Sequence, residues 1–413
     1  MTHTRIGLTV AASVAAIIAS TASHAVEITA GDWKFSATGN VNAHYIVATC
    51  EDSPATVAGG LACTRSPGQD SSSSSVSNGL LPAALALSAS TTQSGYDIAA
   101  TFGFYPGIST NDASPNLQQG ASNINTGLGT TQIDMRQVFL TFGNDQMGTF
   151  LLGRNIGLFG QDAILNDMTL LGVGGGGGNY AAPANTSLGS IGLGYIYTDW
   201  LAQIDYTTPE LAGGLKLTVG LFDPLEPVPT PGSALTPIST PKSSPGFHAK
   251  AAYKVSDELY LSATGIYQKQ KGVTNASDFN SWGFDAGGKF KIAGFEVLGW
   301  YYYGKGMGTT ALFFNASDGL GNERKSDGFL AQATYTIDKT KFGVNYGQSK
   351  LDLANGEINP TLVEKNEKFT VGVYYNLTKN LTLLAEGSQI KATSQIGAEN
   401  KAQNYNVGAF LAF

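Results

Sequence analysis

Residues 404–413 end the chain with the sequence NYNVGAFLAF. Apolar side chains stand at every second position of this stretch: Tyr405, Val407, Ala409, Leu411 and Phe413. A repeat of two places alternate side chains on opposite faces of a β-strand. Such a strand either belongs to a membrane-spanning barrel, with its apolar face in lipid, or lies in a soluble sheet with one buried face. The stretch therefore predicts an all-β protein and leaves its environment open.

The other end of the chain has the features of an export signal. Arg5 precedes an apolar run over 6–18, and small residues follow it. The run is too short and too rich in small residues for a membrane-spanning helix, and the pattern is that of a secretory signal peptide. We expect residues 1–25 to be removed and residues 26–413 to form one domain. Since no second long apolar segment follows, this domain would have to cross a membrane as a barrel.

Composition narrows the choice of function. The chain has 52 Gly, 13% charged residues and a mean hydropathy of −0.03, which fits a β protein and excludes a helical membrane protein. Without Arg5, 23 basic and 31 acidic groups remain, a net charge of −8. Such an acidic chain is a poor binder of nucleic acid. Its two remaining histidines, His44 and His248, are far apart in sequence, and we expect neither a metal site nor a cofactor.

The same alternation recurs along the whole domain and predicts an antiparallel up-and-down barrel of about 16 strands. The expected strands are 33–47, 80–92, 96–105, 130–142, 148–156, 191–207, 215–222, 246–255, 259–269, 281–292, 295–303, 327–337, 341–350, 367–377, 381–390 and 402–413. Short and long connections alternate between them, as a membrane barrel requires. We interpret the long tracts, including 48–79 with its serine run and 157–190, as solvated loops.

One stretch carries a family resemblance. Residues 134–178 read DMRQVFLTFGNDQMGTFLLGRNIGLFGQDAILNDMTLLGVGGGGG. This stretch resembles the Gram-negative general porin family in the order and spacing of four short motifs. They are Asp134-x-Arg136, the turn between Gly143 and Gly148, Leu-Gly-Arg154-Asn and Asn-Asp167-Met. That resemblance, supported by the terminal Phe413, implies a trimeric, 16-stranded diffusion channel of the outer membrane.

The resemblance also implies a site. In that family a long third loop folds into the lumen and presents acids opposite basic wall residues. Carried over, the pore constriction consists of Arg136, Arg154, Asp134, Asp162 and Asp167, with Asp205, Asp285, Lys216 and Lys250 along the wall. Opposed charges in a narrow channel orient polar solutes. Because these groups nearly balance, we expect weak charge selectivity, tilted towards cations by the net charge.

The sequence departs from the family where a second loop acid is usual. Leu171 stands there, followed by Gly172, Val173 and five glycines through Gly178. We therefore expect a weaker field and a more flexible constriction. Two structural alternatives stay open: Arg154 could only satisfy a buried acid such as Asp134 or Asp162, and Asp167 could be an exposed loop acid.

Two other functional classes also occur among membrane barrels: enzymes and substrate-specific channels. A barrel enzyme needs a nucleophile with a placed base, and the chain has no G-x-S-x-G motif, so we expect no catalytic residues. A substrate-specific channel for a saccharide or small organic acid is the alternative function, suggested by Trp300 and Tyr302 on the predicted inner face.

The remaining expectations concern assembly. Cys50 and Cys63 lie 13 positions apart and should form a disulfide in the oxidising periplasm. The resemblance implies a homotrimer, recognition of Phe413 by the barrel assembly machinery, and contact with outer-membrane lipid and lipopolysaccharide.

Overall fold

The computed structural model describes residues 26–51, 57–62, 71–108, 133–175, 186–211, 213–227, 242–271 and 277–413. The expected signal peptide, 1–25, lies outside these ranges. The described residues form 18 strands in one antiparallel sheet. The strands are β1 Val26–Ala30, β2 Trp33–Cys50, β3 Ser72–Ser77, β4 Ala84–Gln93, β5 Tyr96–Pro106, β6 Ile133–Asn144, β7 Gly148–Ile156, β8 Trp200–Thr207, β9 Leu215–Phe222, β10 Gly246–Lys254, β11 Leu259–Gln270, β12 Phe279–Ile292, β13 Phe295–Lys305, β14 Lys325–Ile337, β15 Thr340–Leu351, β16 Val363–Asn376, β17 Leu381–Ser394 and β18 Glu399–Ala412.

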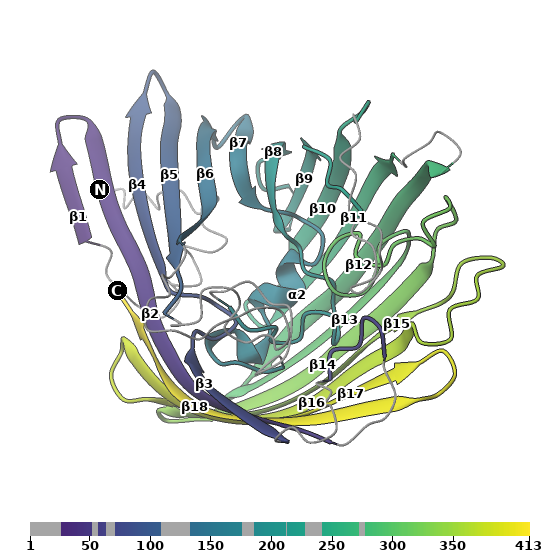
Figure 1. The fold of residues 1–413 in the computed structure, drawn as a ribbon. Coiled ribbons are helices and arrows are strands. Elements are labelled where there is room, and N and C mark those ends of the chain that lie inside the picture. The colour runs from purple at the N-terminus through teal and green to yellow at the C-terminus, as the bar shows by residue number, and fades with distance from the viewer. Residues whose placement is uncertain are drawn as a thin grey trace.

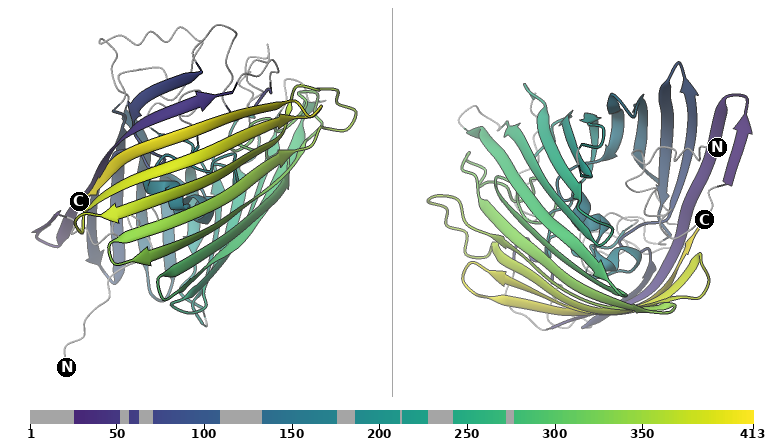
Figure 2. Two further views of the ribbon diagram at one scale, coloured as in Figure 1. Left: turned by 90° about the horizontal axis from the view of Figure 1, so that it is seen from below. Right: turned by 180° about the vertical axis from the view of Figure 1, so that it is seen from behind.

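Sixteen of these strands, all except β1 and β3, close into a barrel, which confirms the predicted fold class. Each pairs with the next one along the chain, and β18 closes the ring by pairing with β2 from Ala402↔Cys50 to Ala412↔Asn40. The strands run obliquely around the lumen (Figures 1 and 2). At the seam, Gly39 and Phe413 exchange two backbone hydrogen bonds of 2.8 and 2.9 Å, so the last residue of the chain takes part in closure.

The outer face of the barrel carries the apolar half of the alternation. Val41, Val219 and Phe342 are 54, 54 and 50% exposed, whereas Asn42 and Asn345, which alternate with such residues, are 1% exposed inside. Polar atoms therefore point to the lumen and apolar ones to the surroundings, the arrangement expected in lipid.

Two strand predictions need correction. The serine run, predicted as loop, forms β3, which pairs with β2 from His44↔Ser77 to Thr49↔Ser72. β2 has 18 residues and β4 has 10, so the second half of β2 extends past the end of β4. The backbone N–H and C=O groups on that edge would lack hydrogen-bond partners, and β3 supplies them. The strand predicted over 191–207 begins only at Trp200, because Gly192, Gly194 and Asp199 adopt positive φ and interrupt the extended chain.

The connection between β7 and β8 enters the barrel. It contains the helix α2, Gln161–Leu165, and the 3₁₀ helix η1, Met168–Leu171. Figure 1 shows α2 inside the ring of strands. We call residues 157–175 and 186–199 the inner loop. None of the helices in the described ranges is long and apolar enough to cross a membrane.

Candidate functional site

The inner loop is attached to the far wall of the lumen at its start. The backbone N–H of Gly160, just before α2, donates to Asp285 Oδ2 on β12 at 2.5 Å. Asp285 is 1% exposed, so the expected wall acid is a fixed anchor for the loop. The first N–H groups of a helix have no partner within the helix, and a side-chain oxygen such as this one satisfies them.

Asp162 on α2 forms the second anchor. Lys250 Nζ on β10 lies 2.9 Å from its carboxylate, and Ser262 Oγ and Tyr260 OH on β11 donate to Oδ2 at 2.7 and 3.0 Å. Burial pushes the pKa of Asp162 up, but the Lys250 charge and these hydrogen bonds outweigh it and hold the pKa below its usual range. Asp162 is therefore paired with Lys250, and neither Arg136 nor Arg154 is its partner.

Asp167 joins two parts of the inner loop to each other and to β15. Its carboxylate accepts hydrogen bonds from the backbone of Thr169 at 2.9 Å and of Ser190 at 3.1 Å. Tyr195 OH donates at 2.8 Å and Asn345 Nδ2 at 3.3 Å. Asp167 is 4% exposed, so it is not an exposed loop acid, and its charge is held by donors.

The end of the described loop rests on Glu386 of β17, which sequence reasoning missed. Its Oε2 accepts from the backbone N–H groups of Val173 and Gly174 at 2.8 and 2.9 Å, and Tyr374 OH donates to Oε1 at 2.6 Å. A Cβ at Gly172 would collide with this carboxylate, so the glycine permits the close approach. Glu386 thus holds the backbone at Val173 and Gly174. The expected flexibility of the glycine tract stays a prediction, because residues 176–185 lie outside the described ranges.

Arg136 faces the lumen on β6, as predicted. Its Nε donates to Asp134 Oδ2 at 2.7 Å, and the guanidinium carbon lies 5.2 Å from the ring centroid of Tyr105 and 5.9 Å from that of Trp200. The Arg136 side chain is 5% exposed and that of Asp134 is 44% exposed. Salt bridge and rings hold the positive charge at a fixed place on the wall.

Arg154 does not join this site. It is exposed, and its neighbours across the strands are Val138 and Ala202, both also exposed. Val138 belongs to the apolar outer face, so the Arg154 side chain leaves the barrel on the outside. The structure therefore brings Asp162 and Asp167 together through the inner loop, with Arg136 on the adjoining wall, and excludes Arg154.

Besides Lys250, the described part of the wall carries Lys216, Lys289 and Lys341, which point into the lumen near the rim with short connections. The residue that follows each lysine, Leu217, Phe290 or Phe342, lies on the outer face and is 37, 41 or 50% exposed. The lysines themselves therefore face inwards. Lys289 Nζ donates to Asn166 Oδ1 at 2.5 Å, and Lys341 Nζ lies 4.7 Å from the ring centroid of Tyr374. All three are partly exposed and contribute positive charge to the water in the lumen.

Two further wall residues are paired. His248 Nε2 on β10 lies 2.8 Å from Asp205 Oδ1 on β8, and their side chains are 0 and 6% exposed. This contact passes over Gly220 of the intervening β9, where a Cβ would collide with Asp205. The expected lumen acid Asp205 therefore has a structural partner.

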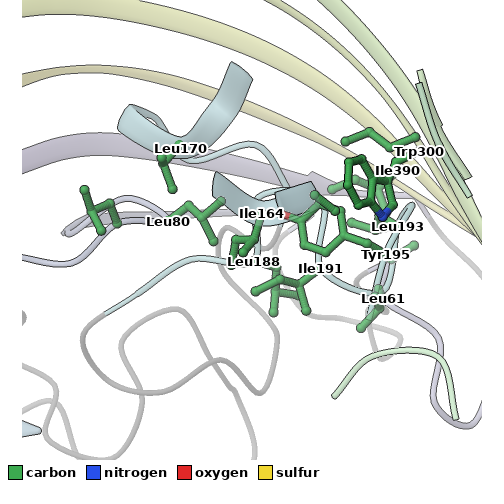
Figure 3. Close-up of a cluster of buried hydrophobic side chains, with 14 of the residues drawn as sticks. Leu61, Leu80, Ile164, Leu170, Leu188, Ile191, Leu193, Tyr195, Trp300 and Ile390 are labelled. Carbon is green, nitrogen blue, oxygen red and sulfur yellow. The ribbon is translucent and has the colours of Figure 1, made fainter. Parts of the chain in front are cut away.

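The interior around the inner loop is apolar to an extent that sequence reasoning did not anticipate. Figure 3 shows Ile164, Leu188 and Ile191 of the loop packed with Leu80 and other buried side chains. Trp300 and Tyr302, predicted on the inner face, are 3 and 1% exposed and belong to buried clusters. They therefore pack beneath the loop and do not line an open path.

The wall anchors could be found only in part from the sequence. Glu386 is the one charged residue of the predicted strand 381–390, at a position whose parity faces the lumen. Gln332, whose side chain accepts from the backbone of Met168 at 2.9 Å and donates to the carbonyl of Asn166 at 2.7 Å, carries no comparable signal.

A closed barrel with an apolar outer face and an inward loop defines a membrane channel of the porin type. The model of the Gram-negative porin family matches residues 9–395, and the chain belongs to that family. No curated protein sequence matches it. The protein is accordingly a passive diffusion channel of the outer membrane and not an enzyme.

Solved structures share the fold at low identity. The outer membrane channel DcaP of Acinetobacter baumannii is 16% identical, with a TM-score of 0.65 over 93% of this chain and 99% of that one. Salmonella typhi OmpF, in complex with daunomycin, is 14% identical, with a TM-score of 0.58 over 94 and 100%. OmpT of Vibrio cholerae is 14% identical, with a TM-score of 0.56 over 94 and 100%.

Proposed function

We propose that small hydrophilic solutes and ions pass through the part of the lumen that the inner loop leaves open, with weak charge selectivity. The observation that carries this proposal is that three contacts fix the inner loop across the lumen. They are the ion pair of Asp162 with Lys250 and the hydrogen bonds of Asp167 with Asn345 and of Glu386 with Gly174. A fixed obstacle narrows the path permanently, so solute size should limit passage more than charge does.

The groups that set the charge preference differ from the expected ones. Asp162, Asp167 and Glu386 are 7, 4 and 5% exposed and bind donors of the protein itself. Arg136 is likewise buried and paired with Asp134, so the partly exposed lysines of the wall contribute the positive charge to the lumen. Fields from outer charges are screened within about 8 Å at physiological salt. We therefore propose a weak preference for anions in place of the cation tilt that net charge suggests.

Planar-bilayer recording tests this proposal. The purified channel should give stable, passive conductance in KCl and a small reversal potential of the sign for anions across a salt gradient. A reversal potential of the sign for cations would refute the charge assignment, and absence of conductance would refute the open path.

A second candidate function is a channel for a particular small organic acid or saccharide. An apolar cavity of about 460 Å³ beside Arg136 favours it, because a purely general pore has no need of such a site. Block of the KCl current by one class of solute and not by others of the same size would distinguish it from the general channel.

We further propose a homotrimer. The structure of Vibrio cholerae OmpT, 13% identical with a TM-score of 0.52, is a trimer form. In this chain Ala43 pairs with Ala409 at the seam between β2 and β18, so small side chains on the outer wall permit close approach of another copy. A monomeric mass for the detergent-extracted, unheated protein would contradict the trimer.

Contacts with the cell envelope also stay proposals. On the outer face of β16–β18, Lys391 bridges Glu367 at 3.6 Å and Glu399 at 2.5 Å, with Lys365 and Lys401 beside them. Such lysines suit the phosphates of lipopolysaccharide. Charge-neutral variants of the three lysines should bind purified lipopolysaccharide more weakly. Recognition of Phe413 by the assembly machinery predicts that Phe413→Ala lowers the yield of folded barrel in the outer membrane.

The disulfide is proposed on the same terms. Cys50, the last residue of β2, is 6% exposed, whereas Cys63 lies outside the described residues. In the entropic account, a bridge closing so short a loop contributes about 3 kcal/mol. Reactive thiols in protein isolated without reductant would contradict it.

A further inference from the structure

A cavity of about 460 Å³ lies between the inner loop, the wall at β6–β8 and the connection after β13. Most of its lining is apolar and includes Leu165 and Leu188 from the loop, Ile156 and Trp200 from the wall, and Phe314. Its size falls in the range of sites for small organic ligands, and apolar walls with few polar groups are typical of such sites.

Among the described residues that line this cavity, Arg136 and Asp199 have charged side chains. The guanidinium of Arg136 is held in place by the rings of Tyr105 and Trp200 and by the carboxylate of Asp134. Asp134 does not line the cavity, and its side chain is 44% exposed.

Asp199 lies at the edge of this cavity in the connection before β8. Burial raises its pKa, although a hydrogen bond from the backbone of Trp200 at 2.6 Å and the charges of Arg154 and Arg136 oppose that rise. The cavity thus combines a long apolar surface with the guanidinium of Arg136 at its wall.

We propose that this cavity binds amphipathic organic anions, with an aromatic or alkyl body against the leucines and a carboxylate towards Arg136. An apolar wall alone would bind a neutral molecule of the same shape equally well, and a positive charge alone would bind acetate equally well. A site with both should prefer molecules that have an apolar body and a carboxylate. This inference rests on the proposed passage of solutes through the lumen, because such an anion would then bind within the path and slow the flow of ions.

Single-channel recording in KCl with added 4-phenylbutyrate tests the site. We expect interruptions of the current whose frequency rises with concentration. Butyrate has the charge with a shorter body, 4-phenylbutan-1-ol has the body without the charge, and 4-phenylbutylammonium has the opposite charge. All three should block at least about tenfold more weakly, because a charge-assisted contact and an aromatic ring each contribute on this scale.

Two variants separate the parts of the site. Arg136→Gln should weaken block by 4-phenylbutyrate about tenfold and leave block by the alcohol nearly unchanged. Leu165→Asn, at a partly buried position, should weaken block by both molecules. Arg154→Gln is the matched control. It also removes a guanidinium whose charge acts on Asp199, but this guanidinium points out of the barrel and does not line the cavity.

The outcomes are separable. Equal block by the alcohol, stronger block by the ammonium, or unchanged block in Arg136→Gln with normal KCl conductance would overturn this inference while leaving the channel intact. Loss of KCl conductance in the unmodified protein would instead refute the proposed function. Heat-modifiable migration of each variant on gels shows independently of its conductance that the barrel has folded.

Discussion

Lys250 Nζ lies 2.9 Å from the carboxylate of Asp162, and their side chains are 11 and 10% exposed. One partner comes from a strand and the other from the helix inside the lumen, so this pair attaches the inner loop to the wall. Removing one member of a buried pair leaves a charge without its partner, which costs about 3–5 kcal/mol. The position of the loop therefore depends on both residues.

The first prediction concerns this pair. Asp162→Asn and Lys250→Met should each loosen the loop and give larger, noisier single-channel currents. Because they remove the same contact, the double variant should be no worse than the singles, with a coupling of about 1–3 kcal/mol in the stability of the folded barrel to urea. Asp223→Asn, at an exposed acid, is the control. Additive effects of the two substitutions would contradict the anchor.

Acid should release the same anchor. The pKa of Asp162 is lowered in the folded protein, so its contribution is fully present above the unfolded value of about 3.9 and is lost as the pH falls through the folded value. The part of the current noise that depends on Asp162 should rise as the pH falls below about pH 4. Asp162→Asn should lack this acid-dependent change. A rise in noise near pH 6 would implicate another group.

Glu386 should hold the end of the loop. Glu386→Gln weakens charge-assisted hydrogen bonds to Val173 and Gly174, each contributing about 1.5–3 kcal/mol, and should increase conductance. Glu399→Gln, on the outer wall, is a matched control with a 38% exposed side chain. Equal conductance of the two variants would show that the loop does not depend on Glu386.

The two arginines provide a paired test of charge selectivity. A unit charge within a few ångströms of an ion in water contributes up to about 1 kcal/mol, so Arg136→Gln should shift the permeability ratio towards cations about twofold to fivefold. Arg154→Gln should leave the ratio nearly unchanged, because its side chain lies outside the barrel. Reversal potentials across a KCl gradient measure both. A larger shift from Arg154→Gln would place that residue at the constriction after all.

Much of the barrel was predictable because each strand shows its alternation locally. β9 begins and ends where expected, and Arg136 and Asp134 lie on the predicted strand. The sequence also predicts that Arg154 points outwards, because it stands two and four positions after the apolar residues Leu152 and Phe150 and therefore lies on the same face of the strand. The family resemblance outweighed that signal.

The loop anchors were beyond sequence reasoning for a physical reason. Asp162 and Lys250 are 88 positions apart in the sequence, and Glu386 and Gly174 are 212 apart. Only the closure of the barrel and the path of the inner loop bring the members of each pair into contact. The strand β3 was missed because a run of serines has no apolar period; its pairing depends on the unequal lengths of β2 and β4.

The most direct test of the account is the swelling of liposomes containing the purified protein in solutes of increasing size. A passive channel narrowed by a fixed loop should admit the smallest neutral solutes and show a steep fall in swelling rate with size. Asp162→Asn and Glu386→Gln should move that fall to larger solutes, while Glu399→Gln should not. Absence of swelling with any solute would contradict the passive channel, and a size limit that stays the same when both loop anchors are removed would contradict the fixed inner loop.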